Sequence, residues 1–78
     1  MKRILITGGA GFIGTNFVYH MAGKGYDLTV LDKLTYAGGK DNLEPLISTN
    51  KVKFINGDIC DPAAVKASLE GVDAVVHF

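Results

Sequence analysis

The feature that most restricts the fold of this chain is a glycine-rich turn between a short apolar run and an apolar helical segment. The turn reads Thr7-Gly8-Gly9-Ala10-Gly11-Phe12-Ile13-Gly14. Gly8 permits a tight turn at positive φ, Gly11 lets a pyrophosphate approach the backbone, and Gly14 lets helix and strand pack closely. The N–H groups that begin such a helix, at the positive end of its dipole, bind phosphate. Strand, glycine turn and helix in this order therefore predict a phosphate-binding loop.

A second apolar run ends in an acid at the place where a dinucleotide site needs one. Asp32 follows Leu28–Leu31 and stands eighteen residues after Gly14, close to the ~20 residues typical of the acid that binds the adenosine ribose. The glycine spacing is G-x-x-G-x-x-G rather than the commoner G-x-G-x-x-G, and a chance glycine turn with an unrelated acid is the alternative. The two signals together favour a dinucleotide site. Asp32 would repel a 2′-phosphate and so prefer NAD to NADP, a preference that Lys33 would weaken.

The remaining apolar runs and chain breakers predict alternating strands and helices. Strands are expected over residues 3–7, 27–32, 52–56 and 73–78, and helices over 12–24, 41–47 and 62–70. Right-handed crossovers then give an α/β fold, part of a Rossmann-type doubly wound parallel sheet with strand order 3-2-1-4. Its ligand crevice lies above the carboxyl ends of strands 1 and 4, where the order reverses. Thr7-Gly8, Asp32 and Asp58 converge there.

Side-chain placement is predicted from periodicity. Ile13, Phe17 and Met21 recur at helical spacing and are expected to face the sheet, with Phe12 also in the core. His20, near the end of that helix, is expected in solvent. Cys60 stands between Ile59 and Asp61 and is interpreted as a semi-buried loop thiol rather than a reactive one, since no acid–base pair is placed to activate it.

Composition bounds the class of protein. The 78 residues make at most one small domain, and eight basic residues balance eight acidic ones without a basic run. Nucleic acid and anionic membrane surfaces are therefore not expected as partners. A single cysteine suits the reducing cytoplasm. The N-terminus lacks the apolar region of a signal peptide, and no run reaches the length of a membrane span.

Two strings give the chain a family resemblance. The glycine turn resembles the fingerprint of extended short-chain dehydrogenases/reductases, and Leu31-Asp32-Lys33-Leu34-Thr35-Tyr36-Ala37-Gly38 resembles the second-strand loop of the dTDP-glucose 4,6-dehydratases within that family. Gly57-Asp58-Ile59-Cys60-Asp61 and Val75-Val76-His77-Phe78 also match that family's segments. Gly39 departs from it, where asparagine is usual. The match covers the whole chain but about the first quarter of such an enzyme.

The resemblance implies that strand-end residues bind NAD. The positions it implies are Gly8, Gly11, Phe12, Ile13, Gly14, Asp32, Lys33, Leu34, Thr35, Asp58, Ile59 and Phe78. In that family the N–H groups at Phe12 and Ile13 bind the pyrophosphate. Asp32 holds the adenosine ribose, which residues 33–35 line.

The adenine, in the same resemblance, lies against Asp58 and Ile59. The Asp58 carboxylate accepts from the adenine amino group, and Ile59 covers one face of the ring. Phe78 begins the segment near the pyrophosphate and the nicotinamide ribose. Alternatives remain at two positions, because Asp58 also suits a turn and Lys33 a solvated surface.

The resemblance further implies an enzyme whose catalytic groups are not among these residues. Tyr36 and Lys40 have the Tyr-x-x-x-Lys spacing of the family's catalytic pair, but two glycines between them oppose the helix that such a pair needs. The implied parent is a cytoplasmic, homodimeric lyase that oxidises a nucleotide-linked glucose at C4, eliminates water across C5–C6 and reduces C6. Alternatives are a nucleotide-sugar epimerase or decarboxylase of the same family, and a stand-alone dinucleotide-binding module.

Overall fold

The computed structural model describes residues 2–33 and 40–78, which form a parallel sheet between helices. The four strands are β1 (Arg3–Thr7), β2 (Asp27–Asp32), β3 (Val52–Asn56) and β4 (Ala74–His77). Their order across the sheet is β3-β2-β1-β4, and every neighbouring pair is parallel. The predicted order 3-2-1-4 and the predicted bounds of β1, β2 and β3 are confirmed, whereas β4 is one residue shorter at each end than the predicted 73–78.

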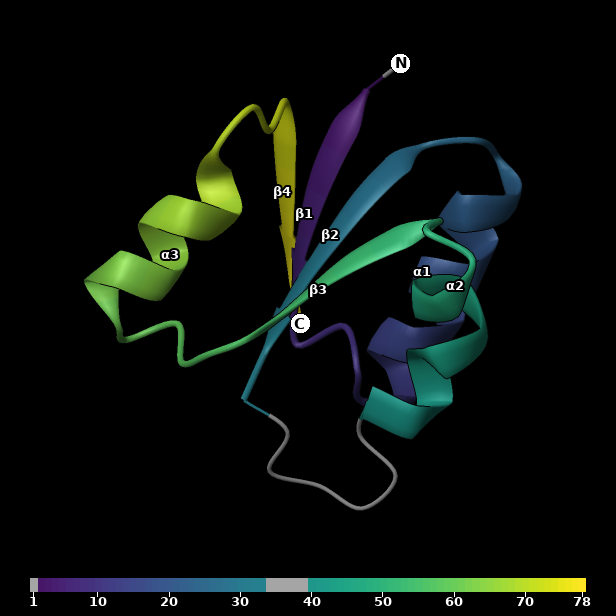
Figure 1. Cartoon of the computed structure of the whole chain (residues 1–78), viewed down its shortest axis with the longest axis horizontal. Helices are drawn as coiled ribbons and strands as arrows, with labels where there is room; N and C mark the ends of the chain where they lie inside the picture. Colours follow the sequence, from purple (N-terminus) through teal and green to yellow (C-terminus); the bar gives the residue numbers. More distant parts are fainter. Residues whose placement is uncertain (1, 34–39) are drawn as a thin grey trace.

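The helices cover the two faces of the sheet unequally (Figure 1). Helix α1 (Phe12–Gly23) and the short α2 (Glu44–Ser48) lie on one side, and α3 (Pro62–Leu69) lies alone on the other. A 3₁₀ turn, η1 (Lys40–Leu43), precedes α2. The single short helix predicted over 41–47 is therefore two elements, with Pro45 in the first turn of α2, where it needs no N–H partner.

Local signals explain where the helices begin and end. Asp61 caps α3, since its carboxylate accepts a hydrogen bond from the N–H of Ala63 at 3.0 Å. Gly25 and Gly71, which follow α1 and α3, have φ values of +86° and +72°, a conformation that favours glycine. Gly25 is therefore the left-handed glycine that ends α1.

The core lies mainly on the α1/α2 face. Nine side chains there are at most 9% exposed, and they are Ile4, Ile6, Ala10, Val18, Leu28, Val30, Leu43, Leu46 and Val52. On the α3 side Leu5 and Leu31 of the central strands are buried, but Ser68 is the one buried residue of the helix itself. Within the described residues, no helix is long and apolar enough to cross a membrane.

Candidate functional site

The glycine turn connects β1 to α1 at the carboxyl end of the sheet. Gly8 has φ +72°, and its N–H donates to the carbonyl of Leu31 on the neighbouring strand at 2.9 Å. A Cβ on Gly14 would lie 2.4 Å from the carbonyl oxygen of Gly8, so the helix begins in direct contact with the turn. Both glycines therefore have the conformational roles that the sequence predicts for them.

The first turn of α1 offers backbone N–H groups to solvent. Gly11 is its N-cap, and no side chain of the described residues caps it. Phe12 and Ile13 are 85% and 70% exposed, so the prediction that their side chains lie in the core is wrong. The contact between Gly14 and Gly8 turns α1 so that Gly14 and Val18 face the sheet, which directs the two residues before Gly14 outward. The exposed N-terminus carries the positive end of the helix dipole.

Asp32 lies beneath the glycine turn. It is 6% exposed, and its Oδ2 accepts a hydrogen bond from the N–H of Ala10 at 3.0 Å. The last residue of β2 thus supports the loop that follows β1, and both belong to the predicted crevice. This contact was not anticipated from the sequence, from which Asp32 was interpreted only as a ligand-binding acid.

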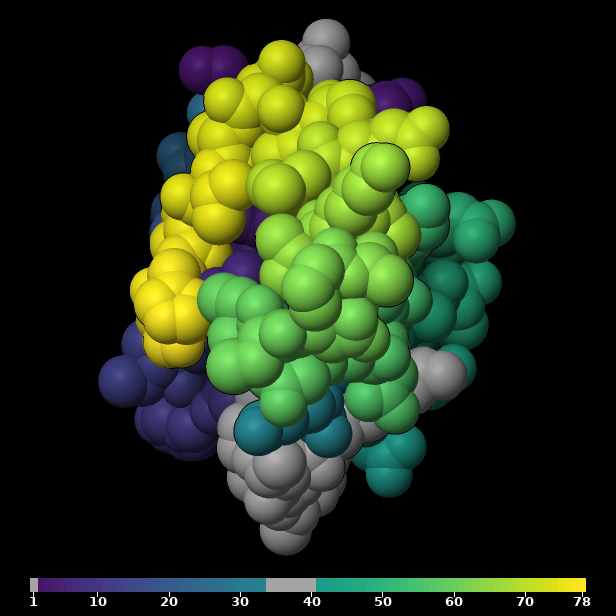
Figure 2. Space-filling view, turned by 90° about the vertical axis from the view of Figure 1, so that its left-hand side faces the viewer, coloured from purple at the N-terminus to yellow at the C-terminus, as the bar shows by residue number. Residues whose placement is uncertain are grey.

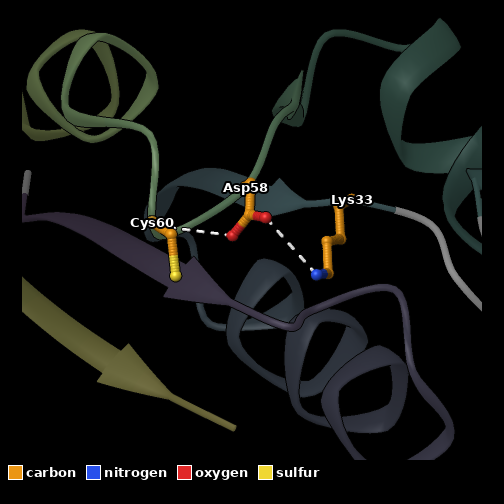
Figure 3. A network of polar contacts seen from close by, with 3 residues as sticks. All are labelled: Lys33, Asp58 and Cys60. Carbon is orange, nitrogen blue, oxygen red and sulfur yellow. Dashed lines mark hydrogen bonds and ion pairs between the residues drawn. The ribbon is translucent and has the colours of Figure 1, made fainter.

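A polar network joins the ends of β2 and β3 (Figure 3). Lys33 Nζ lies 3.4 Å from Asp58 Oδ2, and the N–H of Cys60 donates to Asp58 Oδ1 at 2.8 Å. The Cys60 N–H and the ammonium group of Lys33 both lower the pKa of Asp58. Asp58 is therefore both a turn residue and half of an ion pair. Cys60 is exposed, which corrects the expectation of a semi-buried thiol.

These segments surround a crevice of about 180 Å³. Its lining residues are Thr7, Gly8, Leu31, Asp32, Lys33, Gly57, Asp58, Ile59, His77 and Phe78. Figure 2 shows the purple N-terminal segment at the bottom of a hollow between the yellow C-terminal strand and the green residues around α3. The predicted convergence of the glycine turn, Asp32 and Asp58 on one crevice is thereby observed.

A larger hollow of about 830 Å³ lies against α3, between Ile59 and Glu70. Its lining is apolar apart from Cys60 and the charged side chains of Lys66 and Glu70, and it contains no part of the glycine turn. Ligand sites combine apolar walls with a few converging polar groups. The smaller crevice has these groups, so the functional site is assigned there.

The other predicted positions are only partly described. Ile59 is 49% exposed at the crevice rim, and Phe78 is 45% exposed with its ring centroid 5.4 Å from that of Phe17. Leu34 and Thr35 lie outside the described residues, as does Tyr36 of the dismissed Tyr-x-x-x-Lys pair. Their assignments stay predictions.

Besides the bond between Ala10 and Asp32, two hydrogen bonds and one steric constraint at the site were missed from the sequence. His77 Nδ1 and the Thr7 hydroxyl are hydrogen-bonded across 70 positions of chain. The Asn42 side-chain amide donates to the Ala10 carbonyl at 3.4 Å, and a Cβ on Gly9 would lie 2.8 Å from Val30 Cγ1. Long-range contacts of this kind leave no trace in local spacing. The sequence analysis assigned no role to Gly9; the adjacent pair Gly8-Gly9 is the one local signal that could have indicated it.

The geometry fits a dinucleotide on two grounds. The uncapped start of α1 can receive a pyrophosphate, and a Cβ on Gly8 would lie 2.9 Å from the Phe78 carbonyl oxygen, so a larger residue would obstruct the crevice. The volume of about 180 Å³ is below the ~300–1,000 Å³ of a pocket that encloses a whole ligand. The crevice therefore accommodates one part of a dinucleotide rather than all of it.

Known proteins with similar sequences are enzymes about four times longer than this chain. The dTDP-glucose 4,6-dehydratase of Streptomyces niveus is 48% identical, over 97% of this chain and 24% of its own length. The mouse dTDP-D-glucose 4,6-dehydratase is 43% identical over 99% of this chain and 23% of its own. The chain thus spans about a quarter of the length of these relatives.

Solved structures of longer enzymes also match this chain over its whole length. The Bacillus anthracis dTDP-glucose 4,6-dehydratase in complex with NAD matches with a TM-score of 0.90 and 33% identity, over 100% of this chain and 26% of that one. A UDP-Glc/GlcNAc 4-epimerase from Campylobacter jejuni matches with a TM-score of 0.86 and 39% identity, over 100% of this chain and 24% of that one. The model of the NAD dependent epimerase/dehydratase family matches residues 4–78, and the chain belongs to that family.

Proposed function

We propose that this chain is the NAD-binding part of a nucleotide-sugar 4,6-dehydratase acting on dTDP-glucose. One observation carries the proposal: the glycine turn, Asp32 and Asp58 come from three separate loops and border one crevice at the carboxyl end of a parallel sheet. That is where open α/β sheets bind dinucleotides. The similarity to dTDP-glucose 4,6-dehydratases supports the choice of reaction.

The proposal gives each described segment a role toward NAD. The N–H groups at Phe12 and Ile13, beside Gly8, Gly11 and Gly14, would bind the pyrophosphate. Asp32 and Lys33, with Leu34 and Thr35, would line the adenosine ribose, Asp58 and Ile59 the adenine, and Phe78 the path toward the nicotinamide ribose. NAD would supply hydride acceptance at C4 of the sugar and hydride return at C6. Catalytic and sugar-binding groups would lie outside residues 1–78.

The parent enzyme in this proposal is a cytoplasmic homodimer. Cys60, the one cysteine of residues 1–78, is a free thiol, which suits a reducing compartment. Subcellular fractionation and sedimentation of the full-length enzyme that carries these residues test the two statements separately. Recovery of that enzyme in an oxidising compartment would contradict the cytoplasmic location. Sedimentation as a monomer would contradict the homodimer.

Cofactor choice tests the role of Asp32 most directly. NAD and NADP are titrated by calorimetry into a full-length enzyme that carries these residues, and NAD is expected to bind more tightly because the carboxylate repels a 2′-phosphate. Asp32→Asn keeps an oxygen for the Ala10 N–H and should narrow the difference, whereas Asp32→Ala also removes support for the turn and should weaken NAD binding further. Equal affinities of the unaltered full-length enzyme for NAD and NADP would refute the role of Asp32 in cofactor choice.

An epimerase is the second candidate, supported by the match to the Campylobacter jejuni 4-epimerase. The mass of the product separates the two reactions in a full-length enzyme carrying these residues. A dehydratase yields a 4-keto-6-deoxy sugar lighter than its substrate by one water, and an epimerase yields a product of unchanged mass. A stand-alone binding module, the third candidate, would give neither product, and a reading frame continuing past Phe78 would exclude it.

A further inference from the structure

His77 lies at the crevice and has no role in the function proposed above. It is the last residue of β4 and pairs in register with Thr7 of β1. Thr7 is 5% exposed, and its hydroxyl is hydrogen-bonded to Nδ1 of the exposed His77 ring. Both residues line the crevice together with Asp32 and Asp58. One nitrogen of the imidazole is thus fixed to the buried end of β1.

The alternation of β4 explains why the ring faces the crevice. Ala74 and Val76 pack against the core on the α1/α2 face. Side chains along a strand alternate between faces, so Val75 and His77 stand on the opposite, α3 side. Val75 is 51% exposed there, and the strand ends beside the crevice at His77. The imidazole therefore stands on the open side of the sheet with Nδ1 toward Thr7.

The second ring nitrogen, Nε2, is the one available for a hydrogen bond to a ligand. Among the residues that the structure describes, no hydrogen bond to Nε2 is found. A neutral imidazole has one donor and one acceptor nitrogen, and the bond made by one decides the role of the other. If the Thr7 hydroxyl donates to Nδ1, the proton is on Nε2, which then acts as a donor.

The crevice needs such a donor if it is to hold an anionic ligand. Its wall includes the carboxylates of Asp32 and Asp58, and the ammonium group of Lys33 is already paired with Asp58. Of the described side chains around the crevice, His77 thus offers an N–H that no other group occupies. Backbone N–H groups at the start of α1 are the other source of donors.

We infer that His77 is a ligand-binding residue: Nδ1 accepts from the Thr7 hydroxyl, and Nε2–H donates to an oxygen of the adenosine diphosphate half of NAD. This inference rests on the proposed function, because NAD is the ligand which that function assigns to the crevice. We choose the adenosine diphosphate half of NAD because His77 lines the same crevice as Asp32, Asp58 and Ile59. The proposed function assigns these three residues to binding the adenosine. The contact ties β4 to the cofactor through a side chain rather than through the backbone.

Two substitutions separate ligand binding from sheet support. In His77→Asn the side-chain amide reaches the position of Nδ1 and can keep the Thr7 bond, but it ends short of Nε2. Binding of NAD and of ADP-ribose by this variant, measured by calorimetry, should each be weaker by about tenfold, the loss of one hydrogen bond to an anion. In His77→Gln the longer amide places a donor near Nε2, and it should recover part of that loss.

The matched control is His20→Asn, an exposed histidine on α1 away from the crevice, which should bind both ligands like the unaltered chain. Unchanged affinity of His77→Asn would overturn the inference and leave the proposed function intact. A loss for NAD without a loss for ADP-ribose would overturn the choice of ligand half. If a full-length enzyme that carries these residues unaltered binds neither ligand, the proposed function fails, and the inferred contact fails with it.

A ligand-free measurement tests the hydrogen-bond direction. Nitrogen-15 NMR of the neutral imidazole should show the Nε2–H tautomer at His77 with a larger excess than at the exposed His20, and Thr7→Val should reduce that excess to the level of His20. A dominant Nδ1–H tautomer in the unaltered chain would overturn the inference whatever the binding data show, because Nε2 would then be an acceptor facing an anion.

Discussion

The two faces of the sheet differ in how completely they are covered. On the α1/α2 face Val18, Leu43 and Leu46 are at most 9% exposed against the strands. On the α3 face the helix contributes Ser68 to the interior, while Leu69 and Val75 are 44% and 51% exposed. Doubly wound sheets bury both faces in their final form. The contrast teaches that one face supplies the stability of this chain, while the other carries the crevice and stays open.

Truncating one leucine on each face should give the largest difference between the faces in the free energy of unfolding. Leu43→Ala removes a fully buried side chain and should cost about 2–5 kcal/mol, enough to unfold most of a chain this small. Leu69→Ala, on the half-exposed α3 side, should cost less than about 1 kcal/mol. Urea unfolding followed by circular dichroism measures both values. Similar losses in the two variants would show that the faces contribute equally.

Adding a methyl group to one glycine on each side should give a smaller difference in the free energy of unfolding. A Cβ at Gly14 meets the Gly8 carbonyl oxygen at 2.4 Å and the Gly9 Cα at 2.9 Å, and this backbone has no room to move. Gly14→Ala should therefore cost about 1–3 kcal/mol and weaken NAD binding.

At Gly57 the new Cβ would meet the Ala64 Cβ of α3 at 2.9 Å. Because α3 has few buried contacts, it can shift, and Gly57→Ala should cost about 1 kcal/mol or less. Thermal unfolding of the two variants compares them. A larger loss at Gly57 would mean that α3 is held more rigidly than its burial indicates.

The open α3 side should also make the isolated chain associate with itself. The edge strand β3 carries Lys53, whereas β4 (Ala74–His77) carries no Lys, Arg, Asp or Glu to discourage pairing with another chain. Sedimentation of the chain should show concentration-dependent association or poor stability. Val75→Lys should weaken the association by about tenfold, about 1.4 kcal/mol.

Ile13→Lys is the control, since Ile13 is 70% exposed and loses apolar surface as well, but it belongs to helix α1 and has no place on the β4 strand edge. It should associate like the unaltered chain. A monomer with a cooperative thermal transition at ordinary temperatures would contradict this prediction and favour the stand-alone module.

The smallest effect is expected from the ion pair beside the crevice. The pKa of Asp58 is lowered in the folded chain, first by the Cys60 N–H and then by Lys33. A lowered pKa means that the carboxylate stabilises the fold above its unfolded pKa of about 3.9 and loses this effect as pH falls below that value.

Asp58→Asn should therefore shift the urea midpoint slightly at pH 7, and this shift should shrink as the pH falls below the unfolded pKa and the unaltered carboxyl takes up its proton. Asp41→Asn, in the exposed η1 turn, serves as the control. A difference between Asp58→Asn and the unaltered chain that grows toward low pH would show that the pKa is raised instead.

Local sequence signals predicted the strands and their order well. Apolar runs, the Asp61-Pro62 start of α3 and the glycines after the helices each act within a few residues, so they can be interpreted without the fold. The rotation of α1 about its axis could not be predicted in this way. Periodicity gave a stripe that included Ile13, but the contact between Gly14 and the Gly8 carbonyl decides which residues face the sheet.

The crevice was predicted to the level of loops but not of contacts. Asp32, Asp58 and Gly8 could be placed because parallel strands end on one side of a sheet. The bond from Ala10 to Asp32 and the bond between Thr7 and His77 join residues 22 and 70 positions apart. Such contacts depend on strand register and side-chain direction, which no local pattern encodes.

The central position of β1 also sets an order of events in folding. Register partners on β1 and β2, such as Arg3 and Asp27, are 24 positions apart, and those on β1 and β4, such as Ile4 and Ala74, are 70 apart. Closing the longer loop costs about 1 kcal/mol more in chain entropy. During synthesis the first three strands can pair while β4 is still inside the ribosome. The crevice, which needs His77 and Phe78, is thus completed only after the first three strands have paired.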